Sequence, residues 1–279
     1  MRVGFLGPSG TFAEEALRSS VPSGVSAEEI PYATVWETVM AVQERAVDQA
    51  VVPIENSLEG SVTTTLDALA GEGSDVRIVA EVVRPISHCL IARAGVRVED
   101  VERVLSHPQA LAQCARFLHE RMPGARTEVS GSTAEAVRTA VGSAEPLAAI
   151  GTALAAELYG GSVLASGVED RPDNLTRFVW LAPAGTAPHG DPDKTSVVFW
   201  GFNDESPGAL VAVLRELADR GVNLTKIESR PRRVQLGHYM FFADLDGAAD
   251  TPAVVGALEG LARRVDTLQV LGSYRAALL

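Results

Sequence analysis

The chain has 279 residues, 46% of them hydrophobic and 22% charged, which is the composition of a globular protein with one large or two ordinary domains. Its formal net charge of −12 argues against a nucleic-acid partner, because phosphate binding requires clustered Lys and Arg. An anionic ligand would be repelled at long range, so an anion site in this chain must depend on short-range hydrogen-bond donors.

The first ten residues, MRVGFLGPSG, lack the long apolar core of a signal peptide, and no stretch of the chain approaches eighteen apolar residues. We therefore predict a cytoplasmic protein with no membrane segment. Cys89 and Cys114 are too few for a disulfide framework, and we expect reduced thiols packed in the interior. The histidines show no metal-ligand spacing, so no metal site is predicted.

Residues 1–182 alternate short apolar runs with helical patterns, which is typical of an α/β domain. Five apolar runs, each expected to be a strand, lead into a short polar stretch and then a helix: RVGFL into GPSGTF, QAVV into PIENS, RVL into SHPQA, TEV into SGSTAEA and LAAI into GTALA. Open α/β sheets bind ligands at the carboxyl ends of their strands, against helix N-termini. The five polar stretches are therefore predicted to meet at one cleft.

The first two polar stretches each allow two interpretations. The glycines of GFLGPSG lack the G-x-G-x-x-G spacing, and no Walker A motif or G-x-S-x-G elbow occurs, so nucleotide and serine-nucleophile chemistry are disfavoured. Ser9 and Thr11 either cap the following helix or form an anion-binding turn with the same donors. Glu55 and Asn56 are either surface groups or a polar pair in the cleft.

The later stretches also offer polar side chains. In SHPQA, Gln109 and His107 are candidates, although a lone His before Pro is more often structural. Ser132 with Glu135 fits a capping box, and a ligand contact there would be additional.

The stretch DNLTRF, residues 173–178, brings an amide, a hydroxyl and a guanidinium together at the start of an apolar strand. Arg177 either holds a carboxylate with two parallel hydrogen bonds or forms an ordinary salt bridge with Asp170 or Asp173.

Residues 183–193, PAGTAPHGDPD, have no periodicity and are predicted to link a domain at 1–182 to a second domain at 194–279. The second domain is predicted to follow the βαββαβ order of a ferredoxin-like split βαβ sandwich. Its predicted elements are strand 194–202, helix 207–221, strands 222–230 and 238–245, helix 251–265 and strand 267–274. The PGAL stretch begins a helix and the ESRP stretch ends a strand, and together they suggest a small-ligand site.

The strings GPSGTF, PIENS, SHPQALAQC, STAEA and NLTRF, in this order, resemble prephenate dehydratase, and GAL and ESRP on a βαββαβ unit resemble its phenylalanine-binding ACT domain. The resemblance extends from Gly7 to Tyr274. It implies an α/β fold with a two-lobed catalytic domain similar to type 2 periplasmic binding proteins, and a homodimer or homotetramer. The implied reaction is the cofactor-free conversion of prephenate to phenylpyruvate, CO2 and water, with feedback regulation by L-phenylalanine.

The resemblance also implies site residues. The family's essential threonine corresponds to Thr176 and its arginine to Arg177. The substrate site would comprise Ser9, Gly10, Thr11, Asn56, Ser57, Gln109, Ser132, Thr133, Asn174 and Phe178. The phenylalanine site would comprise Gly208, Ala209, Leu210, Asn223, Leu224, Glu228, Ser229, Arg230 and Pro231.

Prephenate carries two carboxylates and a ring hydroxyl, so we expect Arg177 and the N–H groups of helix N-termini to hold the anions. Thr176 would donate a hydrogen bond to the leaving oxygen, with Glu55 the alternative acid if burial raises its pKa. The strand carrying Thr176 and Arg177 is expected to cross between the lobes. Arogenate is the alternative substrate, while a two-lobed solute-binding protein and a non-catalytic amino-acid sensor are the alternatives outside the enzyme class.

Overall fold

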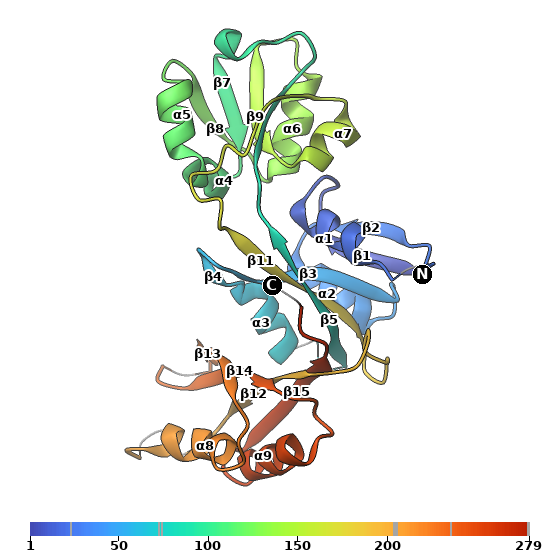
Figure 1. Cartoon of the computed structure of the whole chain (residues 1–279), viewed down its shortest axis with the longest axis vertical. Coiled ribbons are helices and arrows are strands. Elements are labelled where there is room, and N and C mark those ends of the chain that lie inside the picture. The colour runs from blue at the N-terminus through green and yellow to red at the C-terminus, as the bar shows by residue number, and fades with distance from the viewer. Residues whose placement is uncertain (23, 72, 74, 203–205, 235, 278–279) are drawn as a thin grey trace.

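The computed structural model describes residues 1–22, 24–71, 73, 75–202, 206–234 and 236–277. Figure 1 shows three units along the long axis, with the first lobe between the second lobe at the top and the carboxy-terminal domain at the bottom. No helix within the described ranges is long and apolar enough to span a membrane.

The first lobe contains a sheet in the order β2-β1-β3-β11-β5, to which the short β4 adds on β3. One face is covered by α1, whose Leu17 packs with Phe5 and Trp180, and the other by α2 and α3, which pack on Val179. Successive residues of β11 therefore point to opposite faces of the sheet. The elements are β1 Arg2–Leu6, α1 Phe12–Ser20, β2 Glu28–Tyr32, α2 Val35–Gln43, β3 Gln49–Asn56, β4 Gly60–Ser61, α3 Thr63–Ala70, β5 Val76–Pro85 and β11 Leu175–Pro183.

The second lobe contains a five-stranded sheet in the order β10-β6-β9-β7-β8, with a buried apolar cluster on each face. Its elements are β6 Cys89–Ala92, the 3-10 turn Val98–Asp100, β7 Arg103–Ser106, α4 Pro108–Gln113, α5 Ala115–Arg121, β8 Arg126–Val129, α6 Thr133–Gly142, β9 Leu147–Gly151, α7 Ala153–Tyr159 and β10 Ser162–Ser166.

The chain crosses between the lobes at residues 86–88 and again at 167–174, just before β11 (Figure 1). The two crossings are hydrogen-bonded to each other, because Ile86 N–H donates to the Asn174 carbonyl at 2.8 Å and Val168 N–H donates to the His88 carbonyl at 3.1 Å. Thr176 and Arg177 therefore lie at the end of a crossing, inside the first lobe, rather than on the crossing segment itself.

The carboxy-terminal domain has the predicted βαββαβ order and an antiparallel sheet β13-β14-β12-β15. Its helices cover one face, and its other face packs through Phe242 and Tyr274 on α2 and α3 of the first lobe. Gly272 of β15 pairs with Ile78 of β5, so both sheets join into one. The elements are β12 Lys194–Trp200, α8 Ala209–Ala218, β13 Leu224–Pro231, β14 Tyr239–Asp246, α9 Pro252–Ala262 and β15 Thr267–Tyr274.

Candidate active site

A cleft of about 410 Å³ lies between the two lobes, where the predicted polar stretches meet. The polar stretches at the carboxyl ends of β1, β3, β7 and β8 each contribute to its lining, through Thr11, Asn56, Gln109 and Ser132 respectively. The fifth stretch, after β9, does not line the cleft but connects the two lobes. Its Thr152 hydroxyl donates to the Gly10 carbonyl of the first lobe at 2.7 Å. Four of the five predicted polar stretches therefore meet at one cleft, at the strand ends where the sequence predicted it.

The structure separates the predicted substrate-site residues into two groups. Those that line the cleft are Thr11, Asn56, Gln109, Ser132, Thr133, Asn174, Thr176 and Phe178. Those that lie outside its lining are Ser9, Gly10, Ser57, Glu55 and Arg177. Ser132 also caps α6, as predicted, by accepting the Glu135 N–H at 3.0 Å.

Three of the outer residues have structural contacts instead. The Ser9 carbonyl accepts from the Tyr159 hydroxyl at 2.7 Å, and Gly10 has φ +88° with Ala155 directly against it, so these residues join the two lobes. The Ser57 hydroxyl accepts from the Leu175 N–H at 2.9 Å and holds the start of β11.

Asn56 fixes the orientation of the Thr176 hydroxyl. The Asn56 Oδ1 atom accepts the N–H groups of Leu58 and Glu59, each at 3.0 Å, so its Nδ2 must point the other way. From there Nδ2 donates to Thr176 Oγ1 at 2.8 Å and to Asn174 Oδ1 at 2.7 Å. Because the Thr176 oxygen is occupied as an acceptor, its hydrogen remains available to donate to an acceptor in the cleft.

The same hydrogen-bond chain continues into the second lobe. Asn174 Nδ2 donates to Gln113 Oε1 at 3.1 Å, and His88 Nε2 lies 3.2 Å from the same oxygen. Since that oxygen only accepts, His88 must carry its proton on Nε2. Burial removes water from around His88 and so lowers its pKa, which favours the neutral form of the ring. The chain of contacts therefore links Thr176 of one lobe to Gln113 of the other through the crossing segments.

Gln113 and His88 line the cleft but were not predicted as site residues. Gln113 lies within the SHPQALAQC string, one helical turn after Gln109, so its i,i+4 spacing was a usable signal. His88 stands in the first crossing, and nothing in the local pattern distinguishes it from a packed histidine.

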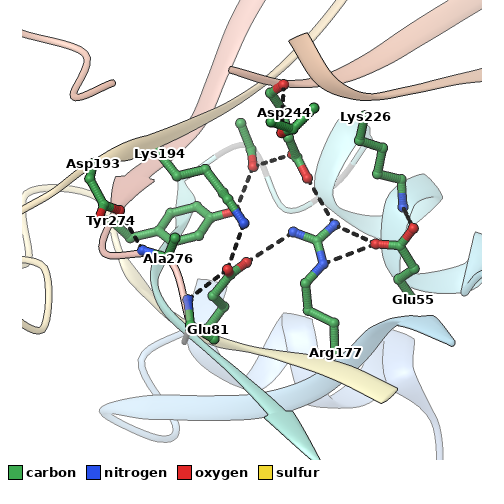
Figure 2. A network of polar contacts seen from close by, with 12 residues as sticks. Glu55, Glu81, Arg177, Asp193, Lys194, Lys226, Asp244, Tyr274 and Ala276 are labelled. Atoms are coloured by element: carbon green, nitrogen blue, oxygen red, sulfur yellow. Dashed lines mark hydrogen bonds and ion pairs between the residues drawn. The ribbon is translucent and has the colours of Figure 1, made fainter. Parts of the chain in front are cut away.

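Arg177 and Glu55 lie on the opposite face of the sheet from the cleft, which corrects their predicted roles as clamp and acid. Strand β3 continues through Asn56 instead of ending before PIENS, so Glu55 and Asn56 face opposite sides. The Arg177 guanidinium contacts Glu55 at 3.0 Å, Glu81 at 3.0 Å and Asp244 at 2.9 Å, as Figure 2 shows.

The alternative salt bridge partners predicted for Arg177 are engaged elsewhere. Asp170 accepts from the Arg116 N–H, and Asp173 pairs with Arg171.

The cleft has no Lys, Arg, Asp or Glu among its described lining residues. Its donors are neutral side chains and the N-termini of α1 and α6, which come from different lobes. Helix N-termini favour anions, each by roughly 0.3–1 kcal/mol. An apolar wall that includes Phe12, Ile86 and Phe178 completes the cleft. The arrangement suits an anionic ligand with an apolar body.

The predicted phenylalanine-site residues do not gather in one hollow of the described chain. Gly208, Ala209 and Leu210 line a hollow of about 340 Å³ together with Tyr239 and Phe241.

The remaining residues of that set lie on β13 or just before it. Asn223 donates to Asp246 at 2.8 Å, and Arg230 pairs with Asp67 of the first lobe at 2.8 Å. Leu224 packs in the core beneath α8 and α9, Glu228 and Ser229 lie within the strand, and Pro231 lines a groove against the first lobe.

The two α/β lobes around a cleft, with a βαββαβ domain attached, define a small-ligand protein with a regulatory-type domain. Residues 3–186 match the family model for prephenate dehydratase and residues 198–263 match the model for the ACT domain. The chain belongs to the prephenate dehydratase family, and it is an enzyme with the predicted fold class.

Several relatives are similar to this chain over nearly its whole length. The chain is 43% identical to a prephenate dehydratase of Mycolicibacterium gilvum, covering 98% of this chain and 90% of that protein. The solved prephenate dehydratase of Arthrobacter aurescens in complex with L-Phe is 42% identical, with a TM-score of 0.90, covering 99% of this chain and 90% of that one. GqqA, described as a quorum quenching acylase, is 32% identical, with a TM-score of 0.85, covering 99% of this chain and 98% of that one.

Proposed function

We propose that this chain converts prephenate to phenylpyruvate, CO2 and water in phenylalanine biosynthesis. The observation that carries the proposal is the Thr176 hydroxyl, held by Asn56 so that its hydrogen is available to the cleft. Relatives at up to 43% identity over nearly the whole chain bear the name of this activity.

The reaction breaks one C–C and one C–O bond. The electron pair of the bond to the departing carboxylate moves into the ring, which becomes aromatic, and the ring hydroxyl leaves and takes up a proton from solvent to form water. Negative charge develops on the departing oxygen, and a fixed donor at this position stabilises it. Thr176 takes this role as a positioned hydrogen-bond donor. Glu55 cannot serve as the acid from its place on the other face, where it contacts Arg177 and Lys226.

The two carboxylates of prephenate are bound by the N-terminal N–H groups of α1 and α6, which face the cleft from opposite lobes. A dicarboxylate held in this way draws the lobes together. The carboxylate that is lost lies toward Phe12 and Phe178, where an apolar surface favours the loss of charge.

L-phenylalanine regulates the enzyme through the ACT domain, an inference supported by the solved relative in complex with L-Phe. The hollow at Gly208–Leu210 and the β13 segment at Glu228–Ser229 are the proposed contacts, and a homodimer or homotetramer would bring such segments of two chains together. We expect Glu228→Ala or Ser229→Ala to raise the phenylalanine concentration needed for half-maximal inhibition.

The test is turnover of prephenate by the purified full chain, followed through the absorbance of phenylpyruvate in alkali, with and without L-phenylalanine. We expect turnover by the wild type and by Thr176→Ser, and a loss of about 10²–10³-fold in kcat for Thr176→Val, which keeps the shape and removes the donor. Arogenate is assayed in parallel, since preference for it would change the substrate assignment. An inert chain, or one that hydrolyses acylated amines instead, would overturn the proposal.

A further inference from the structure

A cluster of six charged side chains connects the first lobe to the ACT domain. The first lobe supplies Glu55, Glu81 and Arg177, with a summed charge of −1, and the ACT domain supplies Lys194, Lys226 and Asp244, with a summed charge of +1. The cluster is neutral only when both parts contribute, and most of its side chains are largely buried, with Glu81 2% and Asp244 11% exposed.

Arg177 is at the centre of this cluster (Figure 2). Its Nη1 atom contacts Glu81 at 3.0 Å, its Nε and Nη2 atoms contact Glu55 at 3.1 and 3.0 Å, and Nη2 also contacts Asp244 at 2.9 Å. Lys194 in turn contacts Glu81 at 2.6 Å and Lys226 contacts Glu55 at 3.2 Å. Burial by itself would lower the pKa of Arg177, but Asp244 and the two glutamates raise it above its ordinary value. The guanidinium therefore stays charged, and one of the carboxylates that balance its charge, Asp244, comes from the ACT domain.

Two members of the cluster, Arg177 and Glu55, lie on the same two strands, β11 and β3, as Thr176 and Asn56. In the pairing of β11 with β3, Thr176 is opposite Asn56 and Arg177 is opposite Glu55. Thr176 and Asn56 face the cleft, while Arg177 and Glu55 face the ACT domain. A backbone shift at Arg177 would therefore also displace Thr176, its neighbour on β11, and with it the Thr176–Asn56 hydrogen bond.

Strand β14 connects this cluster to the proposed phenylalanine hollow. Asp244 lies on β14, whose Tyr239 and Phe241 line the hollow beside Gly208. Ser196 Oγ donates to Asp244 Oδ1 at 2.6 Å and fixes this carboxylate against β12.

We infer that Arg177 is a positioning residue of the active site and that Asp244 of the ACT domain, together with Glu55 and Glu81, holds its guanidinium in place. On this inference, which rests on the proposed function, the regulatory domain supplies part of the frame that aligns Thr176 with Asn56. Arg177 then acts through the strand pair and not on the substrate.

The decisive experiment is a double-mutant cycle on the full chain with prephenate as substrate. Asp244→Asn is expected to lower kcat about tenfold in the wild-type background and by less than about twofold in the Thr176→Val background, because its effect passes through the Thr176 hydroxyl. Equal losses in both backgrounds would mean a general structural effect and would overturn the inference. If Asp244→Asn does not fold, Lys226→Met removes a partner of Glu55 instead and is expected to show the same non-additivity.

Asp67→Asn is the matched control, because Asp67 also joins the first lobe to the ACT domain, through Arg230 at 2.8 Å, but lies on α3 and not on β3 or β11. We expect its kcat and KM to stay within about twofold of the wild type. A loss as large as that of Asp244→Asn would show that any weakened domain contact suffices, and would overturn the specific role of Arg177.

Hydrogen–deuterium exchange gives a second measurement that does not depend on turnover. Asp244→Asn is expected to accelerate amide exchange in the β11 and β3 segments, whereas Asp67→Asn leaves them unchanged. Unchanged exchange in Asp244→Asn would overturn the inference even if prephenate is the substrate. Faster exchange in a chain that is inert toward prephenate would instead place the fault in the proposed function.

Discussion

Replacing Asn56 with aspartate tests whether the direction of the Thr176 hydrogen bond matters for catalysis. The substitution keeps the shape of the side chain and preserves the Oδ1 acceptor for the N–H groups of Leu58 and Glu59. It replaces the Nδ2 donor with a second oxygen, 2.8 Å from Thr176 Oγ1. Because a carboxylate only accepts, the Thr176 hydroxyl must now donate to the new carboxylate and turn its hydrogen away from the cleft.

The size of the expected loss in kcat follows from the hydrogen bond that the turned hydroxyl no longer donates to the departing oxygen of the substrate. Losing one fixed donor to a developing oxyanion costs about 2.7–4 kcal/mol of activation free energy, so kcat should fall about 10²–10³-fold. Rotating the carboxylate does not relieve the effect, since both of its oxygens accept. A flip of the Asn174 amide would satisfy the new oxygen but bring its own carbonyl against Gln113 Oε1, which the native Asn174 Nδ2 contacts at 3.1 Å.

The assay is the steady-state rate on prephenate from about pH 5 to 8, with thermal unfolding as a check on the fold. The Asn56→Asp variant should recover part of its kcat as the pH falls, because a protonated carboxyl again donates to Thr176. Thr176→Ser, which keeps the donor, is the control that should stay active. An Asn56→Asp variant with kcat within about threefold of the wild type at neutral pH would show that the direction of the Thr176 hydrogen bond does not matter for catalysis.

Burial and packing lead to three more predictions. Burial lowers the pKa of His88 below its ordinary value of 6.5, so the neutral form stabilises the fold above that pH. This stability is lost as the pH falls toward the pKa of the folded state. The free energy of unfolding, measured with urea, should therefore fall less on acidification in His88→Gln than in the wild type. Burial raises the pKa of the Cys89 thiol, and that of Cys114 to about 12, so iodoacetamide should label both slowly in the native protein and rapidly in urea. In Gly272→Ala the new Cβ would overlap a carbonyl oxygen of β5, so we expect a loss of about 1–3 kcal/mol in the free energy of unfolding, and no comparable loss in Gly124→Ala, where the space is open.

Periodicity predicted the helices and strands of the ACT domain well because each of them is a local pattern in the sequence. The apolar spacing at Leu210, Val213, Leu214 and Leu217 predicted one helix, and the structure places these side chains in the core beneath α8. Consecutive helices and strands of the domain are separated by short connections, so the order of elements was enough to define the βαββαβ unit.

The two-lobed arrangement contains contacts that local patterns do not encode. Strand β11 returns from the second lobe and inserts between β3 and β5 of the first, although the whole second lobe separates it from both in the sequence. The hydrogen bonds among Asn56, Asn174 and Gln113 form only because of this return. The motifs marked most of these residues as polar and near a strand end, but only the fold determines which atoms face one another.

The position of Arg177 was nevertheless predictable from strand geometry. Side chains alternate along a β-strand, so adjacent residues such as Thr176 and Arg177 cannot both point into one cleft when the strand is regular. The apolar residues that follow show the same alternation, with Phe178 beside the cleft and Val179 in the core shared with the ACT domain. If Thr176 donates to the substrate, its neighbour must face the other way, and a buried arginine there requires carboxylates, which Glu55, Glu81 and Asp244 provide. The adjacency that suggested two groups acting on one ligand therefore indicates a single strand that meets the substrate on one face and the regulatory domain on the other.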